Sequence, residues 1–347
     1  MKKIIYAILC SITIFFINCE REIVYEEPIN SGLKKSYGTP LFNGWDETGS
    51  TGWWNWDTNL ALIKGNLSDD DSNDDFGYIY VQPGLVDYGY LHIDVNNTPT
   101  DFSDDESYPG WQIDNLSYFT THDAVADIAW LSKSGSSNIY IDFGPDYYAL
   151  GGPFSRYDWS GYGYGCENND DFMFCDMDGN GTDDIIKVDS DGKFRIDYFE
   201  NGPGSWDNTY YGYGSATLNT FIAADLDGDG KGDLFKVGRD GKIWIDYASN
   251  GYGSWDLNKS GYGSEQYNFF CCEDFDGDGK ADIGKLDTSG NFRIDFAING
   301  FSSWDLSKSG YGSCSTRKVL CGDFDGDGKA DILTWDANYI RIDYSSE

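Results

Sequence analysis

The sequence predicts an all-β protein, a β-propeller built from four-stranded blades. Two observations lead to this prediction. Several motifs recur with one common period of 49 residues, and each period contains short runs of β-branched and aromatic residues separated by turn signals. Four short strands per unit, at a period of about 40–50 residues, are typical of a propeller blade. A third observation, at the two ends of the chain, indicates how the ring closes.

An aspartate-rich loop marks the repeat. Its four clear copies read DMDGNGTDD, DLDGDGKGD, DFDGDGKAD and DFDGDGKAD. A Trp-Asp pair, a Gly-Tyr-Gly triplet and an Ile-Asp-aromatic triplet keep the same spacing, so each period is one structural unit. The marker residues are Asp176, Asp225, Asp274 and Asp323; Trp206, Trp255 and Trp304; Tyr213, Tyr262 and Tyr311; and Asp197, Asp246, Asp295 and, one residue short, Asp343.

Residues 166–347 hold the clear repeats, and residues 60–165 hold degenerate ones. IYIDF at Asp142 and LHIDV at Asp94 keep the Ile-Asp motif of the repeat. We therefore expect six blades over residues 38–347. A seventh, degenerate blade within residues 38–120 stays open as an alternative.

Within one unit the strands can be placed from residue type. In the repeat that contains Asp225, the first strand is expected at Phe221–Ala224, the second at Leu234–Val237 and the third at Lys242–Tyr247. The Trp-Asp segment supplies the fourth. Asp-Gly and Asn-Gly turns separate the later strands, as is typical of hairpins.

The chain ends predict a shared last blade. The last repeat stops after its third strand-like run, IRIDY, and lacks its Trp-Asp strand. An isolated copy of that piece, Asn43-Gly44-Trp45-Asp46, lies near the start of the chain. We expect a strand from the N-terminal part to close the last blade, because a closed ring leaves no long exposed strand edge.

The first 37 residues predict export and anchoring. Lys2 and Lys3 precede an apolar run, Ile4–Ile17, that is too short to span a bilayer and is typical of a signal peptide. Cys19 follows, an arrangement that resembles a bacterial lipoprotein signal. The prediction is a signal peptide at 1–18 and a lipidated tether at 19–37, with the protein on the outer membrane or secreted. Ordinary secretory cleavage, with Cys19 incidental, is the alternative.

The charge balance limits the possible partners. Lys and Arg number 24 against 59 Asp and Glu, which gives a formal net charge of −35. Nucleic-acid binding needs basic patches, so the composition argues against it. Aromatic residues make up 17% of the chain, which indicates a packed fold rather than a disordered acidic one. The excess of carboxylates calls for a counter-ion.

The aspartate loops are predicted calcium sites. In D-x-D-G-D-G-x-x-D, side chains at positions 1, 3, 5 and 9 can converge on one centre, and hard oxygen ligands in a flexible loop suit Ca²⁺. Position 7 would add a backbone carbonyl. An EF-hand would need Glu at position 12 and flanking helices. Position 12 is Lys187, Lys236, Lys285 or Thr334, and the flanks are strand-like, so an EF-hand is excluded.

The expected ligands follow from the motif. The side chains are Asp176, Asp178, Asn180 and Asp184; Asp225, Asp227, Asp229 and Asp233; Asp274, Asp276, Asp278 and Asp282; and Asp323, Asp325, Asp327 and Asp331. The carbonyls are those of Thr182, Lys231, Lys280 and Lys329. Whether Asp69, Asp71 and Asn73, a partial copy, also bind metal stays open.

Six cysteines follow Cys19. Cys166 and Cys175, and likewise Cys314 and Cys321, occupy corresponding places ahead of two aspartate loops, so disulfides are expected within these two pairs. For the adjacent Cys271 and Cys272, a vicinal disulfide and free thiols are both open.

The motif DFDGDGKADI with its flanking strands resembles the FG-GAP/VCBS repeat of integrin α-chain propellers and of a fungal lectin family. The resemblance covers residues 166–347 well and residues 60–165 weakly. It implies a propeller with calcium in its loops, usually with seven blades. It also implies a binding role, because integrin propellers bind proteins and the fungal relatives bind sugars.

Three classes of function can be considered for this chain. The first is a monomeric binding or adhesion module for a glycan or an extracellular protein. Its candidate contacts are Tyr162, Tyr213, Tyr262 and Tyr311, whereas Trp206, Trp255 and Trp304 are expected to pack between blades. The second is a structural component of the cell envelope. The third, an enzyme, is not expected, because the chain has 2 histidines and no recognisable catalytic constellation.

Overall fold

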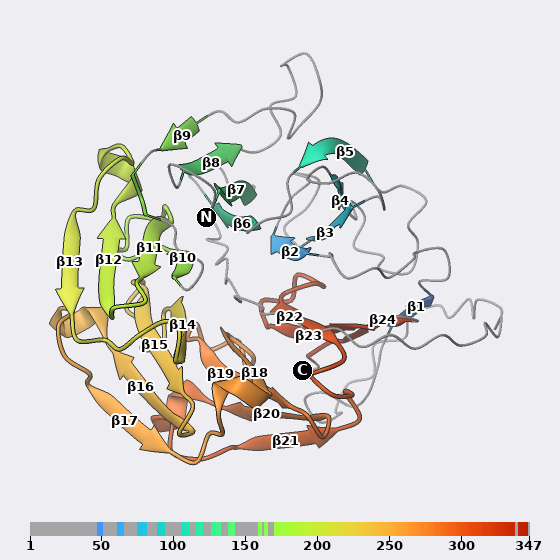
Figure 1. Ribbon diagram of the computed structural model, residues 1–347. Coiled ribbons are helices and arrows are strands. Elements are labelled where there is room, and N and C mark those ends of the chain that lie inside the picture. Colours follow the sequence, from blue (N-terminus) through green and yellow to red (C-terminus); the bar gives the residue numbers. More distant parts are fainter. Residues whose placement is uncertain are drawn as a thin grey trace.

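The computed structural model describes nine strand segments between residues 47 and 161, and then residues 163–165, 170–336 and 339–345. The predicted signal peptide, the tether and Cys19 lie outside these residues. Within the described part, no helix is long and apolar enough to cross a membrane. The described residues are all-β apart from four 3₁₀ turns, as predicted (Figure 1).

The described strands form six four-stranded antiparallel sheets. The first two contain β2 (Ala61–Gly65), β3 (Asp75–Val81), β4 (Gly89–Ile93) and β5 (Glu106–Trp111), and β6 (Leu116–Thr120), β7 (Ala126–Ser132), β8 (Asn138–Asp142) and β9 (Trp159–Gly161). The next two contain β10 (Asp171–Cys175), β11 (Asp184–Val188), β12 (Lys193–Asp197) and β13 (Asn208–Tyr211), and β14 (Asn219–Ala224), β15 (Asp233–Gly238), β16 (Lys242–Asp246) and β17 (Leu257–Ser260).

The remaining sheets contain β18 (Asn268–Glu273), β19 (Asp282–Asp287), β20 (Asn291–Asp295) and β21 (Leu306–Ser309), and β22 (Lys318–Gly322), β23 (Asp331–Trp335), β24 (Tyr339–Asp343) and β1 (Glu47–Ser50). The 3₁₀ turns are η1 (Phe199–Asn201), η2 (Ala248–Asn250), η3 (Glu265–Tyr267) and η4 (Ala297–Asn299). Each sheet is named below by its first strand in this order, so the last is the β22 sheet.

The sheets are arranged around a ring. The first strand of each sheet contacts the first strand of the next, from β2 through β6, β10, β14 and β18 to β22, and β22 contacts β2 (Figure 1). A ring of radially arranged antiparallel sheets is a β-propeller. The fold class predicted from the repeat is therefore confirmed.

The N-terminal part of the chain completes the β22 sheet. β1 pairs antiparallel with β24, with Glu47 opposite Ile342 and Ser50 opposite Tyr339. β1 begins directly after the Trp45-Asp46 pair, just as β17 begins directly after Trp255-Asp256. The expected closure by an N-terminal strand is observed, and it leaves the β22 sheet with four strands like the others.

The first two strands of a sheet are more buried than the last two. In the β14 sheet, the last four residues of β14 and all of β15 are buried, β16 alternates, and β17 has no buried residue. The apolar cores lie between neighbouring sheets: one cluster joins Ile222 and Phe235 to Phe270 and Ile283. The sheets are therefore held together mainly by burial of apolar side chains between them.

Candidate metal centres

Each aspartate loop connects the first two strands of a sheet. In the β14 sheet, Asp225 directly follows β14, and Asp233 is the first residue of β15. Ala224 pairs with Asp233 across the two strands, so strand pairing brings loop positions 1 and 9 together. The same construction recurs in the β10, β18 and β22 sheets.

The loops gather carboxylates as the motif predicts. In each of four loops, three aspartates offer oxygens that lie within 4.8 Å of one another. Positions 1, 3 and 5 form the cluster in the loop of the β14 sheet, and positions 1, 3 and 9 form it in the other three loops. The clusters are Asp176, Asp178 and Asp184; Asp225, Asp227 and Asp229; Asp274, Asp276 and Asp282; and Asp323, Asp325 and Asp331.

Position 1 is the inner anchor of the loop. The Asp225 carboxylate accepts backbone N–H hydrogen bonds from Gly228 (2.7 Å), Asp229 (3.1 Å) and Gly230 (2.8 Å). Gly228 and Gly230 have φ angles of 80° and 84°, a left-handed conformation that glycine adopts without strain. The two glycines therefore let the loop wrap around the first carboxylate.

Position 9 is a fully buried carboxylate fixed by two hydrogen bonds. Asp233 accepts the N–H of Leu226 at 2.9 Å and the N–H of Ala248, in η2, at 2.8 Å. Asp184 and Asp282 make the same pair of contacts, and Asp331 makes them with Phe324 and Ser345. The backbone that follows the third strand of each sheet thus holds the metal loop in place.

Burial disfavours the charged form of these aspartates. It raises the pKa of Asp184, Asp233 and Asp282 to about 8 and that of Asp331 well above its usual range, while the backbone donors oppose the shift. Nearby loop aspartates add repulsion. A bound cation would reverse this balance, because opposite charge favours the ionised carboxylate.

The geometry of the clusters fits a hard cation of calcium's size. Calcium binds oxygens at about 2.3–2.6 Å, so two of its ligands can be at most about 5 Å apart. The clustered oxygens all lie within 4.8 Å of one another, inside that span, and every donor in the clusters is a carboxylate oxygen. Of the other predicted ligands, Asp278 and Asp327, and Asp233 in its own loop, are outside the gathered clusters, and Asn180 stays a prediction. The position 7 carbonyls stay predictions, and Asp69, Asp71 and Asn73 lie outside the described residues.

Neighbouring loops are linked to one another. The carbonyl of Asp176 accepts the N–H of Gly232 in the next loop at 2.7 Å, and Asp225 and Asp274 do the same for Ala281 and Ala330. The three bonds have one length and join position 1 of one loop to position 8 of the next. The four loops therefore form a continuous hydrogen-bonded belt around part of the ring.

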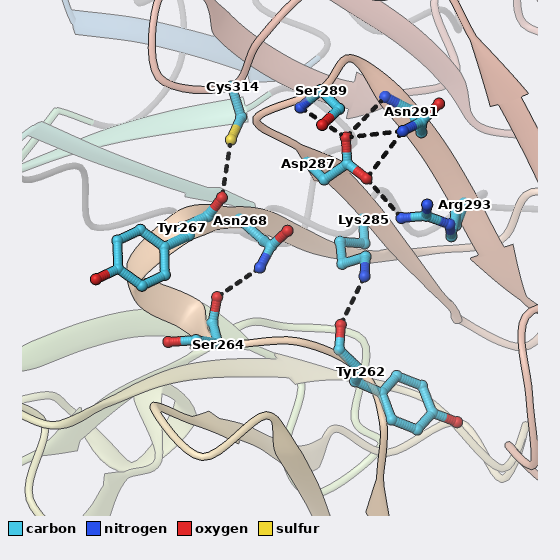
Figure 2. A network of polar contacts seen from close by, with 10 residues as sticks. All are labelled: Tyr262, Ser264, Tyr267, Asn268, Lys285, Asp287, Ser289, Asn291, Arg293 and Cys314. Atoms are coloured by element: carbon cyan, nitrogen blue, oxygen red, sulfur yellow. Dashed lines mark hydrogen bonds and ion pairs between the residues drawn. The ribbon is translucent and has the colours of Figure 1, made fainter.

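Position 12 is a buried lysine in three of the four clear repeats. Lys236 donates to the carbonyl of Tyr213 at 2.9 Å, and its ammonium lies 4.0 Å and 4.3 Å from the ring centroids of Trp244 and Trp255. Lys285 binds the carbonyl of Tyr262 in the same way (Figure 2). Burial lowers the pKa of both lysines to about 8. These lysines tie the Gly-Tyr-Gly segment of one sheet to the second strand of the next.

The Gly-Tyr-Gly tyrosines are buried, so their prediction as ligand contacts is wrong. Tyr213, Tyr262 and Tyr311 are 2–4% exposed. Their hydroxyls donate to Asp246, Asp295 and Asp343, the aspartates of the Ile-Asp motif one sheet further on. Each aspartate holds the tyrosine side chain in place by a charge-assisted hydrogen bond, and such a bond is stronger when it is buried.

In the first repeat the predicted contact, Tyr162, is two residues away from the tyrosine that matches Tyr213. Tyr162 lies outside the described residues, whereas Tyr164, at the matching point of the period, is buried and donates to Asp197 at 2.5 Å. The segment GYGYG offers two tyrosines, Tyr162 and Tyr164. The 49-residue period could have chosen between them, because Tyr164 is the one that lies 49 residues before Tyr213.

The repeated tryptophans pack between sheets, as predicted. Trp206, Trp255 and Trp304 meet Tyr164, Tyr213 and Tyr262 edge to face, with ring centroids 4.9–5.0 Å apart. Each pair joins the fourth-strand segment of one sheet to the Gly-Tyr-Gly segment before it. Such geometry adds stability beyond area burial.

We expect Tyr262→Phe to destabilise the protein by about 1–3 kcal/mol, because it leaves buried Asp295 without its hydroxyl donor. Urea unfolding of the variant and the parent would measure the loss. Tyr267→Phe is the matched control, since Tyr267 is 61% exposed and should change stability little. Equal stability of the two variants would contradict a structural role for the buried hydroxyl.

The predicted Cys314–Cys321 disulfide is not formed. The Cys314 thiol donates to the carbonyl of Tyr267 at 3.4 Å (Figure 2), whereas the sulfur of Cys321 lies 2.7 Å from that of Cys271. Cys321 is in β22 and lies in the core shared with β18, where its sulfur meets that of Cys271, while Cys314 packs against the edge of the same core. Cys166 lies outside the described residues, so its pairing with Cys175 stays a prediction.

Comparison with known proteins supports the fold. No protein-family model matches the chain, and no curated protein matches its sequence. Among solved structures, a lectin from Agrocybe aegerita, described as recognising non-reducing terminal N-acetylglucosamine, is similar with 17% identity and a TM-score of 0.52, covering 83% of this chain and 81% of the lectin. The WD40 domain of Toxoplasma gondii coronin has 10% identity and a TM-score of 0.45, covering 83% and 76%. At these identities, the first similarity establishes a β-propeller fold.

Proposed function

We propose that the chain is a calcium-stabilised β-propeller that acts as a binding module. The observation that carries the metal part is the fourfold recurrence of one built cluster, in which three aspartate oxygens lie within 4.8 Å. Carboxylates this close repel each other strongly unless a cation lies among them. The resemblance of the loops to FG-GAP/VCBS repeats supports the same assignment.

In this proposal the chain's own residues prepare each site. Positions 1, 3 and 9 face the ion, position 5 and the position 7 carbonyl complete its coordination, and the backbone N–H groups hold the carboxylates in place. When bound, calcium supplies the positive charge that lets buried Asp184, Asp233, Asp282 and Asp331 stay ionised. We further propose that the six sheets are the six blades of one closed ring.

The lectin similarity supports a glycan as the ligand class, with an extracellular protein as the alternative. The surface that could receive it lies opposite the metal loops. Strand direction puts the β15–β16 turn and the connections between sheets at that end. Tyr267 and Leu218, which occupy matching points of two repeats, are 61% and 50% exposed there. Arg239, between them, pairs with Glu265 at 3.1 Å and donates to the carbonyl of Thr217.

A glycan array probed with the purified chain in calcium and in chelator tests this function. We expect calcium-dependent binding that Tyr267→Ala weakens at least about tenfold, because loss of a stacking aromatic removes a large share of contact energy. Ser289→Ala, an exposed turn residue of the same sheet, is the control. Absence of binding in both conditions would instead favour the structural role in the cell envelope. We also propose that the protein is exported, is anchored to the membrane through a lipid on Cys19, and is not an enzyme.

A further inference from the structure

Two buried sulfur atoms meet between the last two sheets of the ring. Cys271 in β18 and Cys321 in β22 are each 3% exposed, and their sulfurs are 2.7 Å apart. Heavy atoms that are not bonded pack at about 3.5–4.0 Å, and bonded sulfurs lie about 2.05 Å apart. The separation is therefore well inside unbonded contact, and a small movement would bring the atoms to bonding distance.

Strand geometry selects Cys271 and not its neighbour Cys272. Successive side chains of a strand point to opposite faces. Cys271 lies in the apolar cluster that includes Val319, Cys321 and Ile332, whereas Cys272 lies in the cluster with Ile222 on the other face of β18. A disulfide between Cys271 and Cys272 would join two residues that serve different inter-sheet cores.

The second strand of the β18 sheet makes room for the sulfur. Gly284 in β19 lies opposite Cys271, and a Cβ atom at Gly284 would come 2.6 Å from the Cys271 sulfur. The corresponding pairs in other sheets are Ile222 with Phe235, Met173 with Ile186, and Leu320 with Leu333. Among these four sheets, the one with cysteine at this first-strand position is the one with glycine opposite it.

We propose that Cys271 and Cys321 form a disulfide that joins the β18 sheet to the β22 sheet. The oxidant is a small-molecule disulfide such as oxidised glutathione. One cysteine thiolate attacks it and releases one thiol, and the other cysteine then attacks the mixed disulfide and releases the second thiol. Two protein thiols thus lose two electrons and two protons, and one disulfide is reduced to two thiols. Because both sulfurs are buried, the exchange occurs as the two sheets come together.

The bond would secure the closing sheet of the ring. The β22 sheet is the one completed by the N-terminal strand β1, so its integrity depends on a contact between distant parts of the chain. A cross-link from β22 to β18 restrains the same sheet on its other side. It also restricts the unfolded chain over the intervening residues, which raises stability.

Disulfide mapping of the full chain tests the proposal directly. The protein is folded in a buffer of oxidised and reduced glutathione, unfolded with an alkylating agent to cap remaining thiols, and digested without reduction. We expect tandem mass spectrometry to find Cys271 joined to Cys321, with Cys272 and Cys314 capped. Capped Cys271 and Cys321 in the folded, oxidised protein, or a bond from Cys321 to Cys272 or Cys314, would overturn it.

Melting experiments give an independent readout. Adding a phosphine reductant should lower the melting temperature of the parent and of Cys272→Ser by about 5 °C more than that of Cys271→Ser. Cys272→Ser is the matched control, since it removes the adjacent buried thiol. Equal responses of the two variants to the reductant would contradict the assignment. The mapping on the parent chain remains decisive if a variant fails to fold.

Discussion

Removing calcium from the folded protein is expected to lower its melting temperature by about 20–25 °C. A ligand bound only by the native state at a thousand times its dissociation constant adds about 4 kcal/mol per site, and four loops gather the required carboxylates. Differential scanning calorimetry of chelated protein, with and without added calcium, would measure the change. Magnesium at the same concentration should restore less, because it prefers a smaller, stricter octahedron.

The calcium effect should depend on pH in a definite direction. In the metal-free protein, burial raises the pKa of Asp184, Asp233 and Asp282 to about 8, above the value of about 4 for an unfolded aspartate. The folded state then binds more protons at these three groups, so their contribution to metal-free stability is greatest below about pH 4 and is lost as the pH rises through about 8. Calcium replaces those protons, and its stabilisation should therefore grow over the same range.

A charge-matched pair of variants separates metal binding from acidity in general. Asp227→Asn removes one carboxylate from a loop cluster, and Asp240→Asn removes one from an exposed turn. We expect the first to lose part of the calcium-induced rise and the second to keep it. A melting temperature that does not change on chelation would refute the metal sites themselves.

Asp233→Ala is expected to destabilise the metal-free protein by about 3 kcal/mol. The substitution leaves the N–H groups of Leu226 and Ala248 without their acceptor, and each unsatisfied buried donor costs about 1–3 kcal/mol. Urea unfolding in the presence of chelator would measure this loss, so that metal binding does not enter the comparison.

Asp229→Ala is the control from the same loop. Its exposed carboxylate accepts the N–H of Lys231 at 2.9 Å and belongs to the metal cluster. We expect it to cost less than about 1 kcal/mol without metal, yet to lose calcium stabilisation as Asp233→Ala does. If both variants were equally stable in chelator, position 9 would have no structural role of its own.

Local chemistry made the metal loops and strands predictable. The expected strands Phe221–Ala224, Leu234–Val237 and Lys242–Tyr247 agree with β14, β15 and β16 to within two residues at each end. Residue type and turn signals determine such short elements directly. The aspartate spacing likewise predicted the clusters, because strand pairing at both ends of the loop holds positions 1 and 9 together.

The role of the Gly-Tyr-Gly tyrosines could not be predicted in the same way. Glycines on both sides of Tyr262 indicate an accessible loop, yet its hydroxyl partner is Asp295, on the next sheet. The period relates equivalent residues of different repeats. It does not tell which non-equivalent residues of neighbouring sheets face one another.

The cysteines show the same division. Corresponding positions in the repeat suggested Cys314 with Cys321, but Cys321 faces Cys271, on the neighbouring sheet. By itself, the sequence determined the all-β fold, the period, the N-terminal closing strand and the carboxylate clusters, since these follow from local patterns and strand pairing. Only the tertiary structure decided which side chains meet between sheets, because that depends on the orientation of each sheet against the next.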